Sequence, residues 1–163
     1  VRLSMGIAYA QKKENQNAER QLNRAYQLNP QSYEVLSALG NFYFNVGAYK
    51  RSESAFAGAL QVKKDEMAAS GLARALSAQS RPQECLGVLQ SFLRSGSAGP
   101  GTMIVAAACH EALKQVEEAG ILYKAALELI PKLHRQLPVT LMDSMKKQAE
   151  EGLARLAGAP AAK

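Results

Sequence analysis

The sequence lacks the features that mark membrane-spanning and disulfide-rich proteins. Apolar residues make up 47% of the 163 residues, yet no apolar run approaches the ~20 residues that span a bilayer. Only two cysteines occur, Cys85 and Cys109, and neither belongs to a CxxC motif. We therefore expect no transmembrane helix, no disulfide framework and no zinc site. Two unpaired thiols favour a reducing compartment.

Motifs of catalysis are also missing. There is no phosphate-binding glycine loop, no HExxH motif and no plausible nucleophile–base pair. His110 and His134 have no companions at the spacing of metal ligands. Cys109 precedes His110, but adjacent residues on a helix point about 100° apart. We therefore predict that the chain is not an enzyme and has no catalytic residue, cofactor-binding residue or metal ligand.

The start of the chain does not have the basic-then-apolar layout of a secretory signal. Because the chain begins with Val1, we expect a processed chain or an excised fragment. We expect a cytoplasmic location, with the periplasm or an organelle as alternatives if a targeting segment has been removed. Lys and Arg outnumber Asp and Glu by 20 to 14, which suits a solvated surface and would also assist the approach of acidic partners.

The sequence does contain an internal repeat of about 34 residues. The first small residue of the repeated pattern is Gly6, Gly40, Ala73 and Ala107 in turn, and these positions lie 34, 33 and 34 residues apart. Small residues let two helices approach closely, larger residues between them fill the space, and proline ends a helix. The equivalent positions are Tyr9, Ala18, Leu22, Ala25 and Pro30 in the first segment, Tyr43, Ser52, Phe56, Ala59 and Lys64 in the second, Leu76, Cys85, Leu89, Phe92 and Ser97 in the third, and His110, Ala119, Tyr123, Ala126 and Pro131 in the fourth.

This spacing predicts pairs of helices followed by one further helix. The eight helices of these pairs are expected at about residues 1–12, 15–28, 32–46, 49–62, 66–78, 82–94, 102–114 and 116–130. After Pro131, a stripe that includes Met145 and Ala149 predicts a helix over about 140–157. Such a helix would cap the last apolar face of a solenoid, and the alternative is an amphipathic helix that binds a partner. Residues 158–163 are expected to form a flexible tail.

These motifs resemble those of the tetratricopeptide repeat (TPR) family. MGIAY with A-x3-L-x2-A-x4-P in the first repeat and LGNFY with F-x2-A in the second carry the resemblance, which covers roughly four fifths of the chain. It implies an all-α fold, a right-handed α-solenoid of antiparallel helix pairs, in a single domain over 1–157. The implied repeats cover about 1–32, 33–65, 66–99 and 100–133. Phe92 replaces a small residue in the third repeat, so we expect that helix pair to be splayed or shifted.

The resemblance also implies where a partner would bind. In this family the first helix of each pair lines a concave groove, which selects as partner-binding residues Ile7, Gln11, Asn41, Phe44, Asn45, Arg74, Ile104 and Glu111. An Asn in this position can hold a peptide backbone, because its amide both donates and accepts hydrogen bonds. The carboxylate clamp of some family members needs cations where Ser37 and Met67 stand. A neutral or partly apolar segment is therefore the expected ligand, and structural roles are the alternative for Asn41 and Arg74.

The expected function is that of a non-catalytic protein–protein interaction module or scaffold, within a larger assembly or a longer chain. It would bind a partner peptide or helix in its groove and need no cofactor. The uncovered first helix would contact upstream repeats or another copy of the chain. Two alternatives stay open, a basic helical-repeat RNA-binding protein and a self-assembling scaffold. Nucleic acid is not the expected partner, because few aromatic residues accompany the Lys and Arg pairs.

Overall fold

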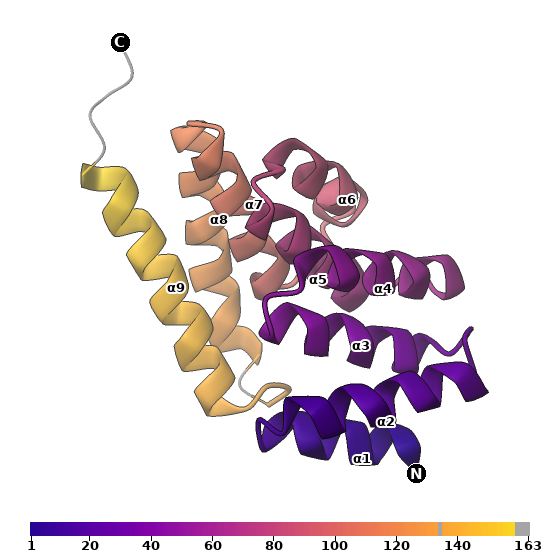
Figure 1. Cartoon of the computed structure of the whole chain (residues 1–163). Helices are drawn as coiled ribbons and strands as arrows, with labels where there is room; N and C mark the ends of the chain where they lie inside the picture. The colour runs from indigo at the N-terminus through magenta and orange to yellow at the C-terminus, as the bar shows by residue number, and fades with distance from the viewer. Residues whose placement is uncertain (134, 159–163) are drawn as a thin grey trace. The chain divides into compact units, whose positions relative to one another are not determined.

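The computed structural model describes residues 1–133 and 135–158, and every regular element within them is helical (Figure 1). The predicted all-α class is therefore confirmed for the described residues. His134 and residues 159–163 of the expected tail lie outside them, while Gly158 ends the last helix. The helices are α1 (Arg2–Gln11), α2 (Asn15–Leu28), α3 (Tyr33–Asn45), α4 (Tyr49–Val62), α5 (Glu66–Ala78), α6 (Pro82–Arg94), α7 (Pro100–Ala112), α8 (Val116–Leu129) and α9 (Val139–Gly158), with a 3-10 turn, η1 (Ile130–Leu133), after α8.

The helices agree with the repeat spacing to within two residues at each end. The turn that follows each of α1, α3, α5 and α7 holds one residue in the left-handed conformation, with φ between 58° and 77°. These residues are Lys13, Gly47, Ser80 and Lys114, and they recur with the period of the sequence repeat. The same backbone conformation therefore recurs after α1, α3, α5 and α7, and glycine occupies this position once among the four.

The first compact unit spans Val1–Arg81 and contains α1 to α5. α1 pairs with α2 and α3 with α4, and α5 packs against α4 and beside α3. The ring of Phe56 from α4 lies in the centre of the second pair. A Cβ atom added to Gly40 would lie 2.8 Å from this ring, and one added to Gly71 of α5 would lie 2.4 Å from it. Both glycines are therefore needed for the close approach of α3 and α5 to α4.

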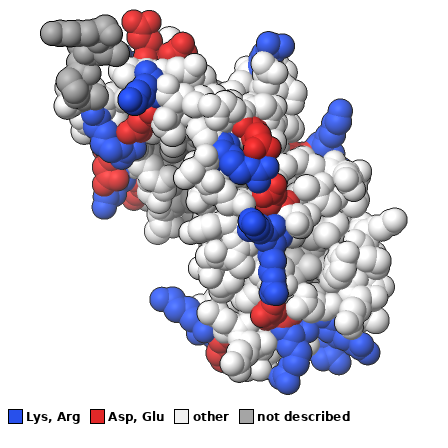
Figure 2. All heavy atoms as spheres, turned by 45° about the horizontal axis from the view of Figure 1, so that its top comes forward, with Lys and Arg blue, Asp and Glu red and all other residues white. Residues whose placement is uncertain are grey.

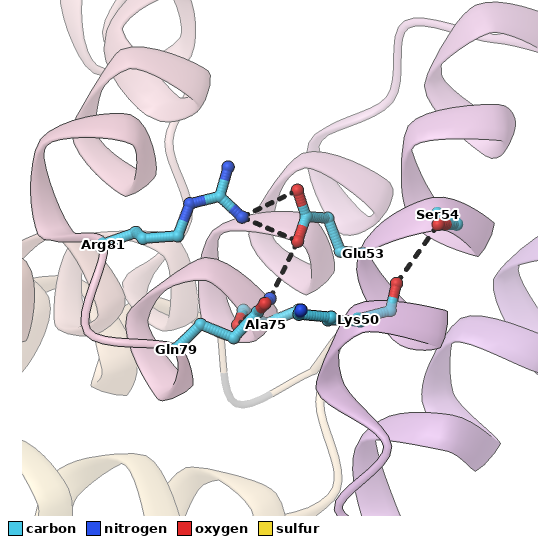
Figure 3. A network of polar contacts seen from close by, with 6 residues as sticks. All are labelled: Lys50, Glu53, Ser54, Ala75, Gln79 and Arg81. Atoms are coloured by element: carbon cyan, nitrogen blue, oxygen red, sulfur yellow. Dashed lines mark hydrogen bonds and ion pairs between the residues drawn. The ribbon is translucent and has the colours of Figure 1, made fainter.

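A polar network joins α4 to the end of α5 (Figure 3). One guanidinium nitrogen of Arg81 donates to both carboxylate oxygens of Glu53, at 2.9 and 2.8 Å. The Gln79 amide donates to the same carboxylate at 2.8 Å and to the carbonyl of Ala75 at 3.0 Å. Because Gln79 and Arg81 follow α5 directly, these bonds fix the end of α5 against α4.

The second compact unit starts at Pro82 and contains α6 to α9. α6 packs against α7, α7 pairs with α8, and α9 packs against both α7 and α8. Met145 and Ala149 of α9 are buried in a core with Ile104, Tyr123 and neighbouring residues. α9 thus covers the apolar face of the last pair, in the position expected of a capping helix.

The two cysteines require a correction. Cys85 of α6 and Cys109 of α7 form a disulfide, with Cα atoms 6.6 Å apart, and both side chains are fully buried. Cys85 occupies the position of a small packing residue on α6, so it faces the neighbouring helix α7. The expectation of two unpaired thiols was wrong because motif spacing tests only local pairs. The argument for a reducing compartment that rested on free thiols no longer holds.

The boundary between the two compact units falls after Arg81, inside the predicted third repeat. Residues 95–99, which connect α6 to α7, lie within the second unit, and Ala98 among them is buried. The single domain over 1–157, with its four repeat boundaries, stays a prediction.

Candidate partner-binding groove

Phe44 and Arg74 form the centre of the candidate groove in the first unit. Phe44 lies in the last turn of α3, and Arg74 lies in the middle of the neighbouring helix α5. The guanidinium carbon of Arg74 is 4.2 Å from the ring centroid of Phe44. On the α4 side, the Phe44 ring is tilted against Tyr49 with the centroids 5.5 Å apart. A cation–π contact of this kind stabilises by about 0.5–1 kcal/mol at an exposed site.

Arg74 is available to a ligand. Within the described residues no carboxylate pairs with it, so the alternative of a purely structural ion pair is not what the structure contains. Burial lowers the pKa of the Arg74 guanidinium below its ordinary value, although the group stays charged at neutral pH. Its N–H groups that face away from Phe44 can donate to a carbonyl or carboxylate of a partner.

Asn41 and Asn45 follow one another by one turn on α3 and are both exposed. The Asn41 amide donates to the backbone carbonyl of Ser37 at 3.0 Å. This bond orients the side chain and leaves its oxygen and its second N–H for other partners. Asn41 therefore combines the structural role considered from the sequence with a free acceptor.

Ile7 and Gln11 are exposed on α1, which lies beside α3. Ile7 retains 40% of its surface exposed. The first helices α1, α3 and α5 thus carry six of the eight residues selected from the sequence. Of these six, the structure brings Phe44 and Arg74 into direct contact.

The remaining two residues have structural roles in the second unit. Ile104 is only 6% exposed and packs in the core that includes Met145 and Ala149 of α9. Glu111 accepts hydrogen bonds from Tyr123 at 3.0 Å and from Arg155 of α9 at 2.7 Å. Their assignment to an open groove is corrected, because α9 packs against the helix that carries both residues.

The hydrogen bonds of Glu111 change the titration of its neighbours. The bond from Arg155 is the main cause of a lowered pKa of Glu111, and the bond from Tyr123 acts in the same direction. Burial, followed by the bond to Glu111, raises the pKa of Tyr123 to about 12. The bond to Glu111 raises the pKa of Arg155. These hydrogen bonds hold α9 against α7 and α8.

One polar cluster was missed by sequence reasoning. The Tyr33 hydroxyl donates to Asp65, and the Lys63 ammonium lies 5.2 Å from the Tyr33 ring centroid. This hydrogen bond lowers the pKa of Asp65, while burial is the main cause of a raised pKa of Tyr33. Asp65 is also the N-cap of α5 and accepts a hydrogen bond from the Met67 backbone N–H. Within this cluster, only the capping role of Asp65 could have been predicted from the sequence.

Among the described residues, no group of three or more His, Cys, Asp or Glu is arranged to hold a metal ion. No helix in the described part of the chain is long and apolar enough to cross a membrane.

The antiparallel helix pairs, the recurring turn and the terminal helix define an α-helical repeat fold of the tetratricopeptide type. Solved structures of the same class support this assignment. A tetratricopeptide repeat protein from Parabacteroides merdae has a TM-score of 0.67 and 14% identity over 91% of this chain. The chain spans 56% of the length of that protein.

Two structures of the protein MamA are similar over nearly their whole length. MamA from Desulfovibrio magneticus RS-1 has a TM-score of 0.67 and 19% identity, covering 96% of this chain and 94% of that one. MamA from AMB-1 has a TM-score of 0.67 and 20% identity, with the same coverage. No protein-family model and no curated protein sequence matches the chain. The TPR-like fold predicted from the repeat is thus confirmed, and at this identity the likeness concerns the fold.

Proposed function

We propose that the chain is a non-catalytic interaction scaffold that binds a peptide segment of a partner protein across α1, α3 and α5. The observation that carries the proposal is the contact between Phe44 and Arg74, which places a partly exposed ring and an arginine without a carboxylate partner on adjacent first helices. Phe44 offers apolar area, and Arg74 offers N–H donors. Asn41 and Asn45 offer the amide groups that recognise a peptide backbone.

The composition of this surface favours a neutral or partly apolar ligand. One cation, two amides and the exposed apolar side chain of Ile7 lie on the first helices of this unit. Aromatic and arginine side chains are typical of the residues that dominate the binding energy at protein interfaces. A short segment with one or two apolar anchors fits this arrangement.

A photo-crosslinking residue in place of Asn45 tests the proposal, with cross-linked proteins identified by mass spectrometry from native lysate. The same probe in place of Lys124, which is exposed on α8 in the second unit, is the matched control. We expect a partner that cross-links from position 45 and not from position 124. Phe44→Ala combined with Arg74→Ala should reduce its recovery by about tenfold, since each removes a central contact.

Circular dichroism would establish that the double variant keeps its helices. Unchanged recovery from the folded double variant, or equal recovery from both probe positions, would contradict the groove model.

A further inference from the structure

The first helix pair carries a second surface feature, a depression lined by arginine and amide side chains. It has a volume of about 520 Å³ and is named here the arginine depression; its lining residues are Arg2, Arg20, Gln21, Asn23, Arg24 and Gln27. Arg2 comes from α1, and Arg20 and Arg24 follow one another by one turn on α2. In Figure 1 α1 and α2 lie side by side, and the space-filling view of Figure 2 shows Lys and Arg gathered along its lower edge.

Each of the three arginines is held by a neutral amide. Arg2 donates to Gln21 at 3.0 Å, Arg20 to Asn17 at 3.1 Å and Arg24 to Gln27 at 3.0 Å. An amide oxygen fixes the direction of a guanidinium without neutralising it. Within the described residues, none of the three forms an ion pair with a carboxylate, and all three are exposed.

Three other arginines, Arg51, Arg81 and Arg155, are bound differently. Each of them pairs with a carboxylate on another part of its own unit, and the pairs are Arg51–Glu19, Arg81–Glu53 and Arg155–Glu111, with N–O distances of 2.9, 2.8 and 2.7 Å. The carboxylates nearest the depression in sequence are already engaged, since Glu14 accepts from Asn17 and Glu19 is bound to Arg51. Residues 1–28 hold five basic and two acidic side chains, so the depression keeps an uncompensated positive charge.

We infer that the arginine depression binds an acidic peptide segment of a partner protein, one that presents two or three closely spaced carboxylates. A guanidinium matches a carboxylate with two parallel N–H···O bonds, and three oriented guanidiniums provide for three such pairs. No aromatic residue lines the depression, so a nucleic-acid base would have nothing to stack on. A depression formed by two helices suits a short peptide better than the flat surface of a membrane.

This site is distinct from the proposed groove, because it uses α2 and the N-terminal turn of α1 and includes neither Phe44 nor Arg74. The two sites also select different ligands. The groove fits a neutral or partly apolar segment, and the arginine depression fits an anionic one. One partner chain could occupy both, but each site can be removed without touching the other.

Fluorescence anisotropy with a labelled decapeptide, three consecutive glutamates in a Gly/Ser context, tests the inference on the whole chain. The triple variant Arg2→Gln, Arg20→Gln, Arg24→Gln removes the site. The triple variant Lys12→Gln, Lys13→Gln, Lys64→Gln removes the same charge from exposed positions outside the depression and is the matched control. A third variant, with lysine in place of the three arginines, keeps the charge and loses the planar fork.

We expect the Arg→Gln variant to bind the peptide at least about tenfold more weakly than the wild-type chain. The Lys→Gln control should stay within about twofold of wild type, and the Arg→Lys variant should lie between these two. Phe44→Ala with Arg74→Ala should leave this affinity unchanged, which separates the two sites. An equal loss of affinity in the Arg→Gln variant and in the Lys→Gln control would overturn the inference in favour of general electrostatic attraction. The inference would also be overturned if the folded wild-type chain did not bind the peptide. The same holds if a ten-nucleotide single-stranded RNA or phosphatidylserine vesicles bound more tightly than the peptide, with the same dependence on the arginines.

Discussion

At the scale of single residues, glycine determines how closely helices approach large rings in this fold. Gly40 and Gly71 lie against Phe56 in the first unit, and Gly152 of α9 lies against Tyr123 in the second. A Cβ on Gly152 would lie 2.3 Å from the Tyr123 ring, and real Cβ atoms essentially never approach a neighbour within 3.0 Å. Tyr123 cannot retreat easily, because it is buried and its hydroxyl is bound to Glu111.

Gly152→Ala should therefore lower the free energy of unfolding by about 2 kcal/mol, the usual cost of overpacking a well-filled core. Urea denaturation followed by circular dichroism would measure the change. Gly87→Ala is the matched control, because Gly87 lies inside α6 with nothing within 4 Å of an added Cβ. It should raise stability by about 0.5–1 kcal/mol through helix propensity. Equal effects of the two substitutions would show that α9 is not packed against Tyr123 as described.

The repeat pattern predicted some of these residues and not others. Gly40 and Phe56 occupy repeated positions, so their contact followed from the spacing. Gly152 lies beyond the repeat, where a helical stripe identifies a buried face but not which side chain the face meets. Arg74 and Phe44 could be placed on neighbouring first helices from the sequence, whereas their contact depends on rotamers that no spacing encodes.

At the scale of elements, α9 is held by both apolar burial and a polar cluster. Met145 and Ala149 are buried on one face, and Arg155 reaches Glu111 of α7 and the Tyr123 hydroxyl of α8. The polar cluster is half exposed at Arg155, so water screens much of its attraction. Apolar burial is therefore the larger contribution, and the cluster mainly fixes the position of the helix along α7 and α8.

The cluster predicts a pH dependence of stability. Because the pKa of Glu111 is lowered in the folded chain, its ionised form contributes stability above the pKa of the unfolded chain, near 4.5, and the contribution is lost as pH falls through the folded pKa. Glu111→Gln should cost at most about 1 kcal/mol at pH 7, and this difference from wild type should vanish towards pH 3.

Urea denaturation at pH 7, 5 and 3 would measure this difference. The control is Glu128→Gln, an exposed residue of α8, which should have little effect at any of the three pH values. A difference for Glu111→Gln that persists at pH 3 would mean that lost packing, not charge, is responsible.

The elements themselves were largely predictable, because period, small residues and prolines are local signals. The start of α7 shifted to Pro100, since proline is favoured in the first turn of a helix. The disulfide between α6 and α7 was not predictable from local spacing. It depends on which face of α6 meets α7, and Cys85 and Cys109 are 24 residues apart in sequence.

At the scale of the whole molecule, charge and cross-linking are distributed unequally between the two compact units. Residues 1–81 contain 11 basic and 6 acidic side chains, and residues 82–163 contain 9 and 8. The first unit therefore supplies most of the net positive charge, together with both proposed binding surfaces. The second unit contains the disulfide and the helix α9, which covers its last helix pair.

This division predicts that a reductant acts on one unit only. Closing a loop of about 24 residues stabilises a fold by roughly 3 kcal/mol, so full reduction should lower the stability of the second unit by that amount. Because both cysteines are buried, reduction must be carried out on the unfolded chain before refolding. Hydrogen exchange should then be faster in α6 and α7 of the reduced protein than of the oxidised protein, and unchanged in α3 and α4.

The variant Cys85→Ala, Cys109→Ala is the control, because its exchange should not respond to reductant. Equal loss of protection in both units would show that they unfold as one, and no loss in α6 would show that packing against α7 holds that helix without the bond.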